Sequence, residues 1–370
     1  CHVQSENDSI SIDILFEIKS SDLEYIDASK YIFLLFEYSF PVELIHEAEN
    51  LEFLIIRDKP KGIIDCSKLS TSLQTLHIGR GRKQPPIKIC NIEALGEKCP
   101  KLTSIRVNRS IQGMLEEVLQ ITSLERLELI DLDLEEMNDL KNPIHINHLA
   151  LLNCSKFDEV NTKVFMNIEA LTISGMEINK EIFETVFPRL KFLAVSFEKE
   201  ITPDVFNFNK NLKYLIIAGP DVDELDLNID SLSVLGLIGM NVRRLELNKC
   251  SSELAIELHM SQIDDFRIKE KLDSSIAYII YDKWSEFYGL ESRVFWNLKG
   301  FTLYRSTSFL YDPRKIEVLY VRSLRNKSIS ELFPNMKELK HLPGLSFVDF
   351  QLLKILKDKK YDDFHTYKRL

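Results

Sequence analysis

Histidine and acidic side chains are the residues of this sequence that could do chemistry, because they bind metals and transfer protons. His145 and His148 stand three residues apart, so a pair of metal ligands is conceivable. They flank Ile146 and Leu149 at an expected strand start, where the two rings would diverge, and we interpret them as surface histidines. An acidic run over 131–139 could suggest calcium, but it lacks the glycine and the ligand spacing of a calcium loop. We interpret this run as a solvated turn.

The six cysteines and the known catalytic motifs give no further site. No two cysteines form a Cys-x-x-Cys pair, and their spacings fit no zinc module, although Cys90 and Cys99 could form a disulfide. The sequence contains no phosphate-binding glycine loop, no His-Glu-x-x-His and no Gly-x-Ser-x-Gly. We therefore predict that the protein is not an enzyme, with no catalytic residue, no cofactor and no metal.

Charge and hydropathy limit the partners of the chain. The formal net charge is −10, so we expect no general attraction to nucleic acid. No apolar run approaches the roughly 18 residues that suggest a membrane span. The chain begins at Cys1 instead of methionine, which points to processing, truncation or a partial sequence. A removed signal peptide would explain this start, so secretion is weakly favoured over a cytoplasmic location.

The strongest pattern is an aliphatic triplet at offsets 0, 3 and 5 that returns every 22 residues. All 18 positions of the six central copies are Leu, Ile or Val. Fainter copies precede them, back to Ile10 and Ile32. The six central triplets are Leu102, Ile105 and Val107; Leu124, Leu127 and Leu129; Ile146, Leu149 and Leu151; Ile168, Leu171 and Ile173; Leu190, Leu193 and Val195; and Leu212, Leu215 and Ile217.

The rhythm changes over 222–268, where triplets follow one another at about ten residues. We interpret every second triplet as an inner strand and those between as extra strands on the outer side, where earlier repeats carry short helices. The inner phase resumes at Ile276 and continues with shortened steps to Met336 and Leu339.

The triplet predicts a solenoid, because offsets 3 and 5 put both side chains on one face of a strand. One repeat cannot bury that face alone, so stacked repeats form a parallel sheet over a continuous core. We predict an α/β solenoid that forms a single domain over 1–357. Its parts are an N-terminal cap with degenerate repeats over 1–50 and a C-terminal capping helix over 345–357. A polar tail follows over 358–370.

These triplets resemble the leucine-rich-repeat family, whose core pattern is Leu-x-x-Leu-x-Leu followed by Asn or Cys at offset 8. Cys154 matches that last position, whereas most repeats depart from it. The resemblance implies a horseshoe with a parallel inner sheet, and a role in protein binding. The irregular repeats, the high Ile, Lys and Phe content and the missing initiator methionine also resemble secreted repeat proteins of microsporidian parasites. That second likeness is compositional and covers no motif.

A local resemblance suggests an alternative function. The repeat starts at 99–102, 187–190 and 333–336 are similar to the Cys-Pro-x-Leu starts of F-box-type solenoids. The segment 40–44, Phe-Pro-Val-Glu-Leu, faintly resembles the opening of an F-box. The alternative is therefore a substrate-recognition adaptor of an F-box ubiquitin ligase, although a repeat already begins at Leu51 and leaves little room for the F-box helices.

Strand positions at offsets 2, 4 and 6 should face solvent on the concave side, yet many of them are apolar or aromatic. Contiguous exposed apolar surface usually marks an interface, and Tyr and Arg are favoured at binding hot spots. Slippage of the repeat phase, or cover by the chain's own tail, would explain the pattern without a partner. We predict a scaffold that binds a protein partner or a second copy of itself through Phe192, Tyr214, Ile216, Val234, Ile238, Tyr278, Tyr304, Tyr320 and Arg322.

Overall fold

The computed structural model describes the chain from residue 32 to residue 341, with gaps. The described ranges are 32–36, 40–57, 60–79, 86–135, 144–156, 162–176, 187–197, 206–207, 209–269, 272–281, 285–288, 294–295, 297–303, 310–311, 313–315, 317–321 and 338–341. The chain divides into two compact units. The first comprises Cys1–Ile178 and Thr185–Arg189, and the second Asn179–Glu184 and Leu190–Leu370.

Parallel strands in sequence order form the inner sheet of the first unit. Each strand pairs with the next at the same step of the repeat, so Leu127, Leu149 and Leu171 stand side by side. The predicted repeat is therefore confirmed in this unit. The strands are β1 (Phe33–Phe36), β2 (Phe53–Ile56), β4 (Thr75–Ile78), β6 (Ser104–Val107), β7 (Arg126–Ile130), β8 (His148–Leu152) and β9 (Ala170–Ser174).

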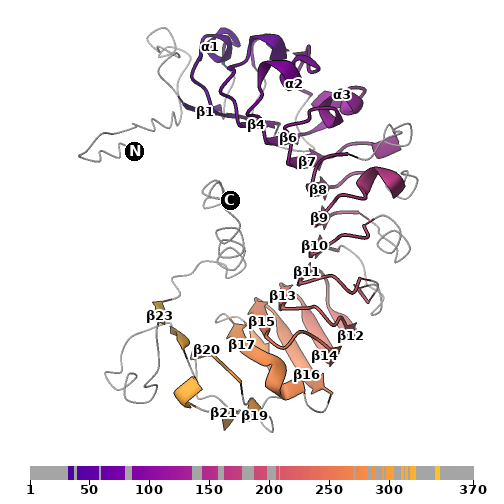
Figure 1. Ribbon diagram of the computed structural model, residues 1–370, viewed down its shortest axis with the longest axis vertical. Helices are drawn as coiled ribbons and strands as arrows, with labels where there is room; N and C mark the ends of the chain where they lie inside the picture. The colour runs from indigo at the N-terminus through magenta and orange to yellow at the C-terminus, as the bar shows by residue number, and fades with distance from the viewer. Residues whose placement is uncertain are drawn as a thin grey trace, which may run out of the picture. The chain divides into compact units, whose positions relative to one another are not determined.

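Short helices return the chain on the outer side of the first unit, as predicted (Figure 1). None of these helices is long enough to be stable alone, so packing of their buried faces on the core stabilises them. In α3, for example, Leu115, Val118 and Leu119 are all buried in the core. The helices are α1 (Glu43–His46), α2 (Ala94–Lys98), α3 (Leu115–Leu119), η3 (Cys66–Lys68), η4 (Arg109–Ile111) and η7 (Thr162–Phe165), with the strand pair β3 (Ile64–Asp65) and β5 (Ile89–Cys90).

The inner sheet of the second unit continues the same design. Leu193 pairs with Leu215, and Leu215 with Leu235, so the aliphatic residues again line up across the strands. The strands are β10 (Phe192–Ser196), β11 (Tyr214–Ala218), β13 (Val234–Ile238), β15 (Leu254–His259), β17 (Ile276–Tyr281), β20 (Gly300–Leu303), β22 (Val318–Val321) and β23 (Glu338–His341).

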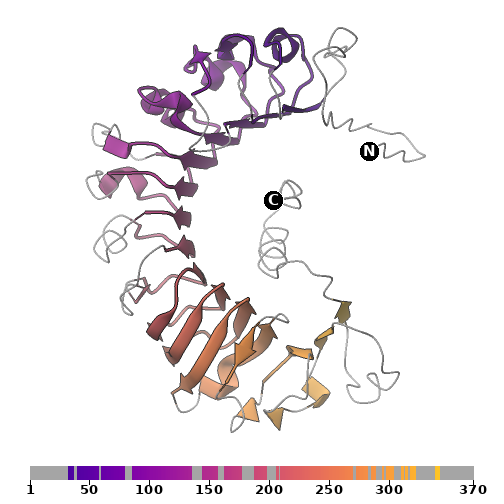
Figure 2. The same cartoon turned by 180° about the vertical axis from the view of Figure 1, so that it is seen from behind.

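A second sheet replaces the helices on the outer side of this unit, which confirms the extra strands predicted over 222–268. Both views show its long strands as a layer beside the inner strands (Figures 1 and 2). Leu225 pairs with Leu245 and Leu245 with Phe266, all three buried toward the inner sheet. The outer strands are β12 (Val222–Asn228), β14 (Asn241–Lys249), β16 (Gln262–Ile268) and β18 (Glu286–Phe287), with the further pair β19 (Val294–Phe295) and β21 (Leu310–Tyr311) and the turns η9 (Leu272–Ser275) and η10 (Pro313–Lys315).

Each unit is thus a leucine-rich-repeat solenoid, with a core between the inner strands and the outer elements. Of the cap predicted over 1–50, only residues 32–36 and 40–50 are described, and they contain β1 and α1. The capping helix predicted over 345–357 and the tail over 358–370 lie outside the described residues. The single domain over 1–357 stays a prediction.

Candidate protein-binding face

The inner face of the second unit is the sheet surface opposite the core, and its described side chains come from β10, β11, β13, β15 and β17. Strand alternation decides which residues reach it, because neighbours of each core leucine point the other way. Three rows run across the strands here. The first row contains Phe192, Tyr214, Val234, Ala255 and Tyr278, the second Ala194, Ile216, Gly236, Glu257 and Ile280, and the third Ser196, Ala218, Ile238 and His259.

Apolar side chains form the first row, and all of them except the buried Ala255 are partly exposed. The rings of Phe192 and Tyr214 are tilted by 41°, with their centroids 6.3 Å apart, a favourable geometry for an aromatic pair. Val234 and Tyr278 extend the row and are also partly exposed. This row gives the inner face an apolar band whose four larger side chains are reached by water.

The second row is more deeply covered. Ile216 points to the inner face as predicted but is only 9% exposed, so it offers little surface to a partner. Its neighbour Gly236 has no side chain, and a Cβ built there would lie 3.4 Å from Ile216 Cγ1. Ile280, two strands further, is buried as well. The exposed apolar surface therefore belongs to the first and third rows.

The structure places six of the nine predicted contact residues on this face: Phe192, Tyr214, Ile216, Val234, Ile238 and Tyr278. Tyr320 belongs to β22, where its side chain is outside the description. Tyr304 and Arg322 lie outside the described residues. Their part in binding stays a prediction.

Sequence reasoning missed Glu257, which sits in the second row with apolar residues on either side. Its side chain is buried, and no described residue donates a hydrogen bond to its Oε1. Burial raises the pKa of this carboxyl well above its ordinary value, because an ionised carboxylate loses its hydration there. The signal in the sequence is a lone acidic residue inside the apolar strand Leu254–His259.

The inner face of the first unit has a different chemistry. His77 pairs in register with Arg106, and Arg106 with Glu128, so charged side chains occupy one row. Arg106 Nε lies 3.4 Å from Glu128 Oε1. Burial, and then the charges of Arg106, Arg126 and Arg57, lowers the pKa of His77 to about 4. Phe33 and Phe53, with ring centroids 6.2 Å apart, form a partly exposed apolar pair on β1 and β2 of the same face. Over β4, β6 and β7 the inner face of the first unit is instead polar.

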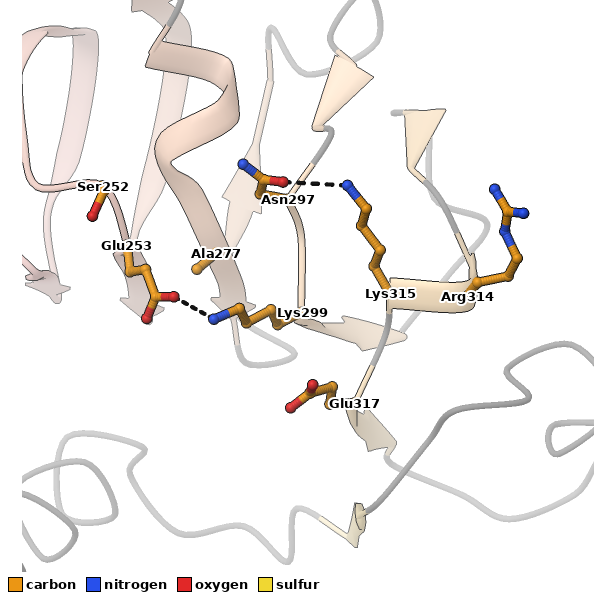
Figure 3. Close-up of a pocket in the computed structure, with 8 residues that line it drawn as sticks. All are labelled: Ser252, Glu253, Ala277, Asn297, Lys299, Arg314, Lys315 and Glu317. Atoms are coloured by element: carbon orange, nitrogen blue, oxygen red, sulfur yellow. Dashed lines mark hydrogen bonds and ion pairs between the residues drawn. The ribbon is translucent and has the colours of Figure 1, made fainter.

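A charged hollow of about 700 Å³ opens in the second unit near the starts of β15, β17, β20 and β22 (Figure 3). Lys299 pairs with Glu253 across it, and Lys315 Nζ donates to Asn297 Oδ1 at 3.3 Å. The hydrogen bond to Glu253 raises the pKa of Lys299. Four of the polar side chains that line the hollow are thus paired with one another.

The acidic run and the cysteine pair take part in local contacts. Among the described residues, no three His, Cys, Asp or Glu side chains are grouped to hold a metal ion. Asp133 and Glu135 of the acidic run bind Lys156, whose Nζ lies 3.1 Å from Asp133 Oδ2. Cys90 and Cys99 are free thiols, and Cys99 Sγ donates to the Ser70 carbonyl. Burial raises the pKa of Cys99 to about 11, so this thiol is unreactive.

No family model matches the sequence. No curated protein matches it. Among solved structures, the chain is similar to an internalin from Listeria monocytogenes, with 15% identity, a TM-score of 0.42, and coverage of 85% of this chain and 88% of that chain. Within the described residues, no helix is long and apolar enough to cross a membrane.

Proposed function

We propose that the protein is a non-enzymatic scaffold whose inner face on the second unit binds a protein partner, with a second copy of the chain as the first case to test. The observation that carries the proposal is the partly exposed apolar band of Phe192, Tyr214, Val234 and Tyr278 on a chain of net charge −10. Exposing such a band to water is unfavourable, and burying it against a matching apolar surface is favourable.

The test places a charge in the band without touching the core. We expect Tyr214→Glu and Val234→Glu to weaken self-association at least tenfold, because each would bury a carboxylate in the contact. The control is Asn228→Glu, on an exposed position of β12 in the outer sheet. Sedimentation equilibrium gives the association constant, and far-UV circular dichroism confirms the fold. A wild-type chain that stays monomeric at all concentrations would exclude self-association.

The alternative function, an F-box adaptor, depends on the segment 40–44. Phe40 is buried and its ring stacks on Phe36 at 3.6 Å, while Pro41 forms a parallel bridge to Lys61. The segment therefore packs as part of the repeat stack, and no described contact favours the adaptor role. The gene sequence upstream of the Cys1 codon tests both ideas: an adaptor-binding box there would favour the ligase, and a signal peptide would favour secretion.

A further inference from the structure

Glu257 is a buried carboxyl that the described structure does not pair. The residue is only 3% exposed, and no described residue donates a hydrogen bond to its Oε1. A buried polar group without a partner costs about 1–3 kcal/mol, and more when it is charged. A side chain in this state calls for a partner, and none of the described residues supplies one.

The neighbours of Glu257 on the inner face carry no positive charge that could fill this role. Gly236 on β13 and Ile280 on β17 flank it in register. The other inner-face residues of β13, Val234 and Ile238, are apolar. His259 on its own strand and Tyr278 on β17 are the titratable groups that these three strands add, and neither contributes to the shift of the Glu257 pKa. Lys299, further along, is bound to Glu253.

We propose that Glu257 anchors one basic side chain, Lys or Arg, of a protein segment that lies on the inner face of the second unit. This inference rests on the proposed function and specifies the chemistry of the partner. The segment presents apolar residues on both sides of the basic one, which pack on the band of the first row. Because Glu257 is only 3% exposed, side chains around it on the inner face must move to admit the basic group.

Charge and shape both select a basic side chain. Lys and Arg combine a cationic head with an apolar stem, so the stem packs against Val234 and Ile238 while the head reaches the carboxyl. A metal ion fits less well, because the described residues hold no group of three ligands. Desolvated charge pairs inside an apolar surround are typical of interface hot spots.

The experiment selects random heptapeptides displayed on phage against the immobilised full-length chain. We expect the recovered peptides to carry one Lys or Arg between apolar residues. The same selection on Glu257→Gln and Glu257→Leu should recover apolar peptides without the basic residue. Both variants remove the carboxyl from an apolar site: Gln keeps a polar group of similar size, whereas Leu is apolar. Glu246→Gln on the outer strand β14 is the matched control.

Affinity gives the quantitative check. Titration calorimetry with a selected peptide should show a loss of about 30-fold or more for Glu257→Gln, and no change for Glu246→Gln, because the anchor charge is missing. Replacing the basic residue of the peptide by norleucine should lower its affinity for the wild-type chain by the same factor. The same replacement should cause no further loss of affinity for the Glu257→Gln variant. Recovery of apolar peptides without a basic residue would overturn the proposed role of Glu257 but would still support binding at the inner face. No enriched peptide at all would overturn both proposals.

Discussion

His77 shows how a single side chain on the sheet can make stability depend on pH. It lies between Ile55 and Arg106 in register, half-buried, with Arg57 and Arg126 close enough to act on its charge. Burial and these cations lower its pKa from 6.5 to about 4. At neutral pH the imidazole is therefore uncharged in the folded chain.

The sign of the pH dependence follows from the two pKa values. Between about pH 4 and pH 6.5 the unfolded chain binds more protons at His77 than the folded chain. This residue's contribution to the free energy of unfolding is therefore complete above pH 6.5 and is lost as the pH falls toward 4. We expect a loss on the order of 1 to 3 kcal/mol.

Urea denaturation at pH 4.5, 5.5 and 7 would measure this contribution. His77→Gln should flatten that part of the pH profile, whereas the control His145→Gln, at an exposed position, should keep the wild-type profile. An NMR titration of His77 with a midpoint near 6.5 would contradict the prediction.

The exposure of single side chains was the property that the sequence predicted least well. It identified the alternation that puts Tyr214 and Val234 on the inner face, because strand parity alone decides it. It could not show that Ile216 is covered, or that Glu257 is buried, since exposure depends on neighbours from other strands. The only local signal is that Glu257 is a lone acidic residue in an apolar strand. Burying a carboxyl is unfavourable, so this signal alone could not predict its burial.

At the scale of the element, the aliphatic triplets were sufficient to predict the inner strands. They predicted the parallel strands and their register, because a shift of one residue would turn each leucine out of the core. The ten-residue spacing over 222–268 also predicted the outer strands β12, β14 and β16. The exact ends of the outer helices were not predictable, since they depend on packing more than on their short sequences.

The turns that follow the inner strands give a test at this scale. Gly175 after β9 has φ +65°, and a Cβ there would lie 2.0 Å from Asn153 Oδ1. Gly239 after β13 has φ +62° with open space around the same position. A left-handed backbone costs any residue with a Cβ about 1–2 kcal/mol, so both positions favour glycine.

The two glycines separate backbone strain from crowding. Gly239→Ala should lower the free energy of unfolding by about 1 kcal/mol, from strain alone. Gly175→Ala should lower it further, because the Asn153 side chain must also move. Urea denaturation followed by circular dichroism measures both. Equal losses would show that the Asn153 side chain yields without cost.

At the scale of the whole molecule, each unit buries its own core. Leu149 in β8 is 2% exposed among residues of the first unit, and Leu237 in β13 is fully buried in the second. Repeat stacks are stabilised by contacts between neighbours, so damage at one position acts first on the repeats beside it. We therefore expect the two units to respond separately to core substitutions.

Amide hydrogen exchange makes that separation measurable, because mass spectrometry follows peptides of each unit separately. Leu149→Ala should cost about 3 kcal/mol, lower the urea midpoint at which peptides of β7, β8 and β9 lose protection, and leave the midpoint of peptides of β13 and β15 unchanged. Leu237→Ala, the matched change in the second unit, should lower the midpoint of the β13 and β15 peptides. If Leu149→Ala lowers both midpoints equally, the units unfold as one cooperative stack, as expected of a single solenoid whose repeats are strongly coupled.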